Sequence, residues 1–443
     1  MTYFLAGLIL LSLPCFIALL KRSQRRRLWA FGAIGMLPLL TNLPLEGFAY
    51  GWSSWSGISR GFNVSIVVML SLALIATRQR SVAKLPFWAL FWFYGITLFV
   101  SVFFASVWLA TVFVWWQFLS VLIVFAAVGG EGHRPEIRNS IISGFAFGLI
   151  YQAAYIIPQK LTGVLQAAGT FTHQNILGHA IELTLLPIIA VVLGGDRRKI
   201  LLLAIAVALI CVAGSGSRGT TAIVGAAIVL LVLLSLMLRT TSRKIGIAVA
   251  GVLALAVATP IAIGTLNDRF QGASFVTEET ERENFENIAR SMADSHLLGV
   301  GANQFVFVSN RDGYADRFNI PWQMSDRSVP VHNAYLLARA ETGWLGELAL
   351  IIIIIVPMIM AIRSAFRYRK KLNGDILIGS AVAIFGVMIH SNYEFAIHLF
   401  SIQALFYINL GLIAAELKNR KLLIRQSRKK VKIAPIESED VVL

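Results

Sequence analysis

Long apolar segments are the feature that most restricts what this chain can fold into, and residues 348–362 (LALIIIIIVPMIMAI) are the clearest example. Of the 443 residues, 57% are hydrophobic and only 14% are charged. A soluble protein of this length has too little polar surface to cover so many apolar side chains, whereas a lipid bilayer accommodates them. We therefore expect an all-α polytopic membrane protein.

Segment length and the breaks between segments predict about 12–13 transmembrane helices. The first segment is followed directly by a basic cluster, which is typical of a membrane anchor and not of a cleaved signal peptide. The predicted segments lie at about 2–20, 28–45, 62–76, 86–102, 106–128, 139–157, 176–194, 200–213, 220–238, 245–263, 334–362, 375–391 and 398–416.

Lys and Arg mark every second loop between these segments. Such clusters predict the cytoplasmic side of the membrane, so we expect the N-terminus outside and the C-terminus inside. The formal net charge of +16 therefore indicates topology and not nucleic-acid binding, and no nucleic-acid partner is expected. Of the 39 Lys and Arg residues, 29 lie in residues 21–27, 78–84, 133–138, 196–199, 239–244, 363–371 and 418–432.

This pattern divides the chain into four parts. Residues 1–263 hold transmembrane helices 1–10 with short loops, and residues 264–333 form one large outer, periplasmic loop. Residues 334–416 hold helices 11–13, and residues 417–443 form a basic cytoplasmic tail with affinity for anionic membrane lipid. Most of the polar chemistry is expected in the outer loop.

The outer loop contains ten acidic residues and six arginines, so it is not a general anion-binding surface. Phe285, Ile288, Ala289 and Met292 recur at helical spacing, and they predict an amphipathic helix at about 281–293. Thr280 with Glu283 fits a capping box at its start. The helix either lies on the membrane surface, roofs a cavity, or simply packs on the bundle as a lid.

Arginine predominates among the basic residues outside the cytoplasmic clusters. Nine of these ten residues are Arg, a preference that fits bidentate recognition of phosphate or carboxylate and that solubility alone does not explain. A structural role and a binding role are equally open for them. They are Arg60, Lys160, Arg218, Arg269, Arg282, Arg290, Arg311, Arg317, Arg327 and Arg339.

Two outer turns carry candidate binding groups. In GSGSRGTT (214–221), Arg218 and the start of the following helix are suited to hold an anion. The turn lacks the Lys of a phosphate-binding P-loop, so nucleoside triphosphate is rejected as a ligand. In GTFTHQNILGH (169–179), His173, Gln174 and Asn175 are suited to hydrogen-bond a sugar or a diphosphate, although a plain capping turn explains them equally well.

Histidine occurs in two further patterns. His332 is expected at the membrane surface, where a lone His is more often structural, but its titration range suits a general base on a sugar hydroxyl. His390, Glu394 and His398 recur every four residues, the spacing of a metal site on one helix face. A predicted helix break near 392–397 opposes that geometry, so no metal site is expected.

Taken together, these motifs resemble the O-antigen ligase and polymerase superfamily over residues 165–415. The resemblance rests on Ser-x-Ser-Arg-Gly at 215–219, His-Asn-x-x-Leu and Glu-Thr-Gly-Trp-Leu-Gly at 332–346, and the Gly-rich turn HLLGVGANQF at 296–305. It implies an enzyme of the bacterial inner membrane that acts at the periplasmic face on a glycan carried by undecaprenyl diphosphate.

The resemblance also implies residue roles. His332 corresponds to the family's base, and Arg218 and Arg282 correspond to its diphosphate-binding arginines. Arg290, eight residues further along the predicted helix, is the alternative to Arg282. We list Arg60, Asn333 and the three polar residues His173, Gln174 and Asn175 as further substrate-binding candidates.

An activated glycosyl diphosphate needs only a base for the acceptor hydroxyl and cations for the leaving group, so we expect metal-independent, inverting transfer without a cofactor. The acceptor is lipid A core oligosaccharide for a ligase, a second lipid-linked repeat for a polymerase, or a protein hydroxyl. We favour the ligase, keep the polymerase as the alternative, and place protein glycosylation behind both. A transporter of lipid-linked sugars is the alternative from another class, but the polar residues gather at the outer surface and no repeated halves are visible.

Overall fold

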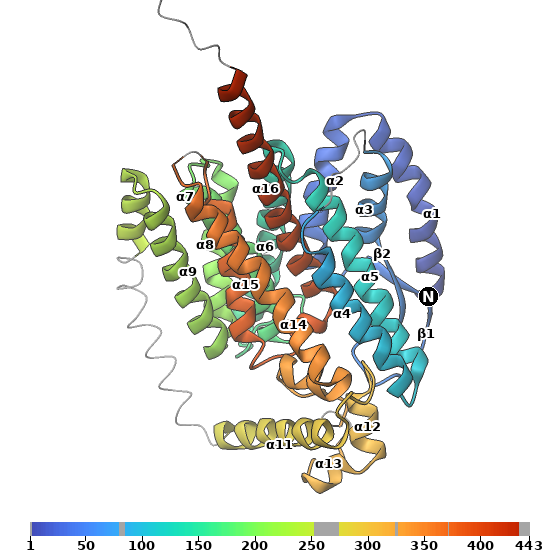
Figure 1. Cartoon of the computed structure of the whole chain (residues 1–443). Helices are drawn as coiled ribbons and strands as arrows, with labels where there is room; N and C mark the ends of the chain where they lie inside the picture. Colours follow the sequence, from blue (N-terminus) through green and yellow to red (C-terminus); the bar gives the residue numbers. More distant parts are fainter. Residues whose placement is uncertain (1, 79–84, 252–273, 324–326, 371, 434–443) are drawn as a thin grey trace, which may run out of the picture.

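A computed structural model describes residues 2–78, 85–251, 274–323, 327–370 and 372–433. Within these ranges, seven helices are long and apolar enough to cross a membrane. They are α1 (Thr2–Lys21), α5 (Trp108–Glu131), α6 (Pro135–Leu161), α7 (Gln174–Leu193), α9 (Arg218–Leu238), α14 (Ala334–Arg367) and α16 (Phe400–Ile433). The predicted all-α polytopic fold is confirmed (Figure 1).

Shorter helices fill the bundle between these seven. Four are apolar, namely α3 (Ile66–Ala76), α4 (Trp88–Ser101), α8 (Lys199–Ser215) and α15 (Asp375–His390), and α2 (Gln24–Met36) joins them. Residues 242–251 are also helical, and the remainder of the predicted segment 245–263 lies outside the described residues. Each of the thirteen predicted apolar segments thus contains helix.

The bundle has enclosed and peripheral helices. Helices α7 and α16 are almost completely surrounded by other helices, and side chains such as Leu177, Ile188, Leu405 and Ile413 are buried. Helices α1 and α9 expose most of their apolar surface, as lipid-facing helices do.

The predicted segment 28–45 is wrong in its second half. Helix α2 ends at Met36 and is followed by a 3-10 turn, η1 (Leu37–Leu39), that contains Pro38. An antiparallel hairpin of β1 (Glu46–Gly51) and β2 (Gly61–Ser65) then precedes α3, so α3 begins later than predicted. Pro38 and Pro44 explain the early end of α2, since proline cannot donate to a helical hydrogen bond.

The basic clusters of alternate loops meet at one end of the bundle, which we call the basic end. Buried Glu131 pairs there with Arg27, with Arg78 at 3.5 Å and with Arg134 at 3.4 Å. Arg138 pairs with Glu416 at 2.8 Å. Helix α16 continues through the first part of the predicted tail, to Ile433, and projects from this end (Figure 1).

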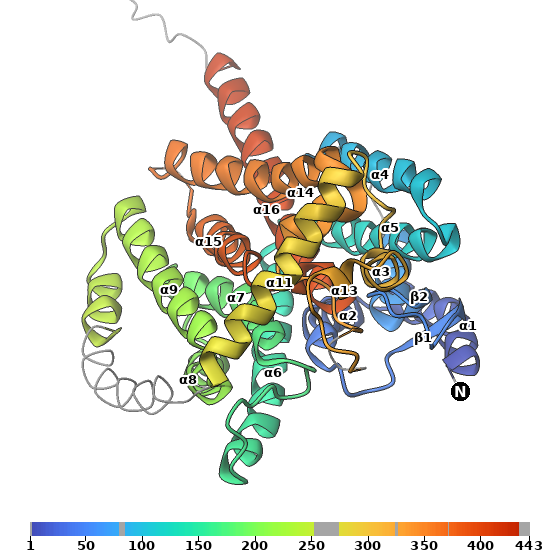
Figure 2. The same ribbon diagram turned by 90° about the horizontal axis from the view of Figure 1, so that it is seen from below.

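The large loop lies at the opposite end, which we call the loop end (Figure 1). It contains α11 (Ser274–Ser295), α12 (Phe305–Arg311) and α13 (Tyr314–Arg317). Ile288, Ala289 and Met292 are buried in a small core with side chains of α12 and α14, so the predicted amphipathic helix packs on the bundle. It crosses the loop end from α8 towards α14 (Figure 2).

The predicted start of this helix is wrong. Thr280 lies inside α11, which is already helical at Ser274, so Thr280 and Glu283 do not form a capping box. Glu278, Glu279 and Glu281 are good helix formers, which favours helix before residue 281.

Candidate active site

A buried carboxylate, Glu394, lies at the centre of the candidate site. Helix α15 ends at His390, and the chain turns through residues 391–395 before the 3-10 turn η3 (Ala396–His398) and α16. The side chain of Glu394 is only 1% exposed at this turn. A carboxylate in such a place is stable only if donors surround it.

His332 is the first of these donors. It lies just before α14, and its Nδ1 is 3.2 Å from Oε1 of Glu394. Backbone N–H of Phe395 donates to the same oxygen at 3.1 Å. With Nδ1 donating its proton to Glu394, Nε2 of His332 carries a lone pair and can accept a proton. The imidazole side chain is 25% exposed, so a substrate can reach it.

Helix α7 supplies the other partners of Glu394. The amide of Asn175 donates to Oε2 at 3.4 Å, and Nδ1 of His173 lies 3.4 Å from that oxygen. Nδ1 of His173 also caps α7 by accepting from Asn175 N at 3.3 Å. The two contacts of this nitrogen require opposite protonation states, so His332 is the firmer donor to the carboxylate.

These partners decide the ionisation of Glu394. Burial alone would raise the pKa of the carboxyl group, but the hydrogen bonds and charges of His173 and His332 outweigh it and hold the pKa well below the ordinary 4.5. Glu394 is therefore an anion at neutral pH. It fixes the tautomer of His332 and stabilises the imidazolium that forms when His332 takes a proton.

The turn that carries Arg218 is connected to the same carboxylate. Ser217 caps α9 by accepting from Thr220 N, and its hydroxyl donates to Oδ1 of Asn175 at 2.8 Å. Asn175 in turn donates to Glu394. Gly216 adopts φ 59°, which lets the chain turn sharply from α8 into α9. Arg218 thus begins a helix that is tied to the His332–Glu394 pair through two side chains.

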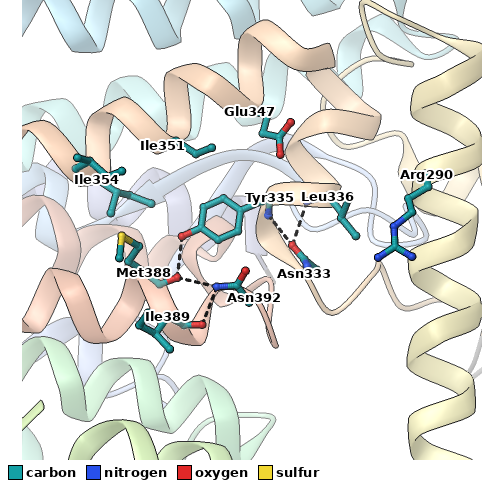
Figure 3. Close-up of a pocket in the computed structure, with 11 residues that line it drawn as sticks. Arg290, Asn333, Tyr335, Leu336, Glu347, Ile351, Ile354, Met388, Ile389 and Asn392 are labelled. Carbon is teal, nitrogen blue, oxygen red and sulfur yellow. Dashed lines mark hydrogen bonds between the residues drawn. The ribbon is translucent and has the colours of Figure 1, made fainter. Parts of the chain in front are cut away.

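A cavity of about 460 Å³ lies between α11, α14 and α15, and Asn333 and Asn392, which are close to His332 and Glu394 in the chain, line it (Figure 3). Its mouth is polar, with the amides of Asn333 and Asn392, the carboxyl group of Glu347, and Arg290 reaching in from α11. Its deeper part is apolar and is lined by Ile351, Ile354, Ile355, Met388 and Ile389. A polar mouth above an apolar wall suits an amphiphilic ligand.

The two loop arginines differ in position. The guanidinium of Arg290 is exposed at the cavity mouth and pairs with Glu286 at 2.6 Å. Arg282, two turns earlier on α11, is half-buried. Both arginines therefore lie over the loop end, where α11 crosses it (Figure 2).

The remaining predicted substrate-binding residues lie at helix starts or on the hairpin. Asn333 caps α14, because its Oδ1 accepts from Tyr335 N and Leu336 N at 3.1 Å each. Gln174 is the first residue of α7 and is half-buried. Arg60 is exposed on the hairpin, and no hydrogen bond or ion pair in the described ranges joins it to Glu394 or its partners.

The sequence interpretation overlooked Glu394 as a partner of His332. The four-residue spacing of His390, Glu394 and His398 does not form a helix face, because α15 ends at His390. The three side chains have separate partners. His390 pairs with Glu182 at 2.8 Å, and His398 lies 3.2 Å from the carbonyl of Ala334. The one available signal was a glutamate directly after a helix end at the outer surface.

The start of α14 is positioned by a kink. Gly343 has φ 70° within α14, so a short segment from Ala334 meets the longer membrane helix at an angle. The Gly-rich turn packs against this kink, with Val300 N and Gly301 N donating to the carbonyls of Ala340 and Glu341 at 3.0 and 2.8 Å. The kink thereby sets the direction of the short segment that begins directly after His332 and Asn333.

Comparison with protein families gives a match over part of the chain. The O-antigen ligase family model matches residues 201–351, which include the Arg218 turn, α11 and His332. This match supports the resemblance to the O-antigen ligase and polymerase superfamily that the sequence motifs indicate. No curated protein matches the sequence. The apolar helices indicate a multi-pass membrane protein, and the family match indicates glycosyl transfer of the O-antigen ligase or polymerase type.

Proposed function

We propose that this protein transfers a glycan from undecaprenyl diphosphate to an acceptor hydroxyl at the loop end, which faces the periplasm from the inner membrane. The observation that carries the proposal is the pair of His332 with buried Glu394 beside a cavity that has a polar mouth and an apolar wall. The lipid of the donor occupies the apolar wall, and its diphosphate occupies the mouth.

A candidate residue can be assigned to each step of the transfer. Nε2 of His332 takes the proton of the acceptor hydroxyl as its oxygen attacks the anomeric carbon. The bond from that carbon to the diphosphate oxygen breaks, and undecaprenyl diphosphate leaves with the electron pair. Arg218, with Arg290 or Arg282, stabilises the charge on the leaving group. Attack opposite to the leaving group inverts the anomeric centre.

The deprotonated Glu394 completes this arrangement. An imidazolium forms on His332 during transfer, and a carboxylate at 3.2 Å lowers its energy while holding the ring in place. A base, a buried anion and guanidinium groups are sufficient for transfer from an activated donor. We therefore propose that the reaction needs no metal ion or other cofactor.

For the acceptor we propose lipid A core oligosaccharide, which makes the protein an O-antigen ligase. The test is to give purified protein the lipid-linked glycan in EDTA, with either lipid A core or a second lipid-linked repeat. Transfer to lipid A core supports the ligase. Chain growth without lipid A core would instead make it a polymerase of repeat units, and donor binding without transfer to either acceptor would favour a transporter of lipid-linked sugars.

A further inference from the structure

A second cavity, of about 370 Å³, lies at the basic end, far from the site described above along the bundle. It is enclosed by the ends of α7, α9, α14 and α15 and by the start of the helical segment 242–251. Its lining is strongly cationic and contains Arg197, Arg239, Arg243, Lys244, Arg369 and Lys370. The one acidic residue in the lining is Asp375.

Asp375 does not offset these charges, because it is already paired. The side chain of Lys244, 4% exposed, donates to Oδ1 of Asp375 at 2.8 Å, and the hydroxyl of Ser235 donates to the same oxygen at 2.5 Å. Lys244 also donates to the carbonyl of Ser235 at 2.9 Å. The floor of the cavity is thus a neutral buried pair, and the other five cations remain in excess.

Two of these cations are oriented by backbone carbonyl groups. Arg243 donates to the carbonyls of Gly195 at 3.1 Å and of Asp196, and Arg369 donates to the carbonyl of Met237 at 3.1 Å. Backbone carbonyls orient a guanidinium but carry no formal charge to cancel it. Gly195 has φ 115°, and no atom lies within 4 Å of the position that a Cβ would take there. This space is open to a ligand.

An exposed apolar surface borders the cavity. Leu233 and Met237 on α9 and Ile245 and Val249 on the next helical segment are about half exposed. Met237 adjoins the cavity directly, because its carbonyl holds Arg369 and the next residue, Leu238, lines the wall. A ligand that joins a phosphate to acyl chains matches both the cations and this apolar surface.

We propose that the cavity binds an anionic phospholipid, with the headgroup phosphate among Arg197, Arg239 and Arg243 and the acyl chains along α9. Basic pockets between helix ends are suited to such headgroups, since each cation adds attraction to the phosphate. A free phosphate ion shares the headgroup chemistry but makes no use of the apolar border. The inference does not depend on the proposed transfer reaction.

The test measures lipid binding to the full-length protein by native mass spectrometry. Phosphatidylglycerol is titrated against phosphatidylcholine, and inorganic phosphate and glycerol phosphate are added as competitors. The variant is Arg197→Gln with Arg239→Gln, whose side chains are exposed and make no hydrogen bond within the described ranges. Arg22→Gln with Arg26→Gln removes the same charge at the same end, outside the cavity.

We expect the Kd for phosphatidylglycerol to rise about 30-fold in the cavity variant and by less than about threefold in the control pair. Arg197→Lys with Arg239→Lys, which keeps both charges, should retain most of the affinity. Equal losses in the two Gln pairs would overturn the proposal, as would equal affinity for phosphatidylcholine. If inorganic phosphate competes at the concentrations at which the lipid binds, the site is one for a soluble anion and the lipid assignment fails.

Discussion

Nδ1 of His332 lies 3.2 Å from Oε1 of Glu394, although 62 residues separate the two in the chain. The kink in α14 at Gly343 and the turn after α15 bring them together at the loop end. The contact fixes which nitrogen of His332 is free, and the proposed chemistry depends on that nitrogen.

Removing the charge of Glu394 should slow transfer strongly while donor binding persists. In Glu394→Gln the imidazolium of His332 loses its counter-ion, so we expect kcat to fall by about 10²-fold to 10⁴-fold. The measurement is glycosyl transfer at saturating donor. Glu136→Gln is the control, since Glu136 is exposed in the first turn of α6, at the basic end and away from the proposed site. Similar rates for the two variants would show that Glu394 has no special role.

Glu394 should also affect the free energy of unfolding at acidic pH. A pKa held below 4.5 by folding stabilises the native state above that pH, and the stabilisation is lost as pH falls through the native pKa. The wild type should therefore lose its advantage over Glu394→Gln in unfolding free energy as pH drops below 4.5. Denaturant unfolding of both proteins across acidic pH measures this difference. A difference that does not change with pH would refute the assigned ionisation.

The kink in α14 depends on glycine at position 343. A Cβ there would lie 2.5 Å from the carbonyl oxygen of Leu297, and φ 70° disfavours any L side chain. We expect Gly343→Ala to destabilise the protein by about 2 kcal/mol or more and to impair transfer. Gly225→Ala in α9, where a Cβ meets nothing within 4 Å, should be neutral or slightly stabilising. Thermal unfolding in detergent compares them.

Arg290 should act mainly on the donor. Its guanidinium at the cavity mouth is placed to bind diphosphate, so Arg290→Gln should lower kcat/KM for the donor by about tenfold to a hundredfold. Arg311→Gln is the control, because Arg311 is exposed on α12 and pairs with Asp312. If Arg282→Gln lowers kcat/KM and Arg290→Gln does not, the diphosphate contact belongs to Arg282.

Much of the fold could be predicted from local patterns. Apolar length located a helix in every predicted segment, and the spacing of Ile288, Ala289 and Met292 identified the buried face of α11. These features depend on residues near one another in the chain. The family motifs likewise singled out His332 and Arg218 as candidates, because both lie within short signatures.

The remaining features depend on contacts between distant segments. Nothing near Gly343 in the sequence marks it as a kink, because its conformation follows from packing against Leu297 and Leu298. Glu394 was assigned only to a metal-ligand spacing that was then rejected, since its partners His332 and His173 lie far from it in the chain, before α14 and α7. Strand β2 was taken as the start of the predicted segment 62–76, because its apolar residues continue into those of α3.

The most direct test of the central claim compares the purified wild type with His332→Ala for donor binding and for transfer, in EDTA and with lipid A core as acceptor. If His332 is the base, the variant binds the lipid-linked donor with nearly unchanged affinity and transfers glycan at least about 100-fold more slowly. Transfer by His332→Ala at a rate close to that of the wild type would contradict the account.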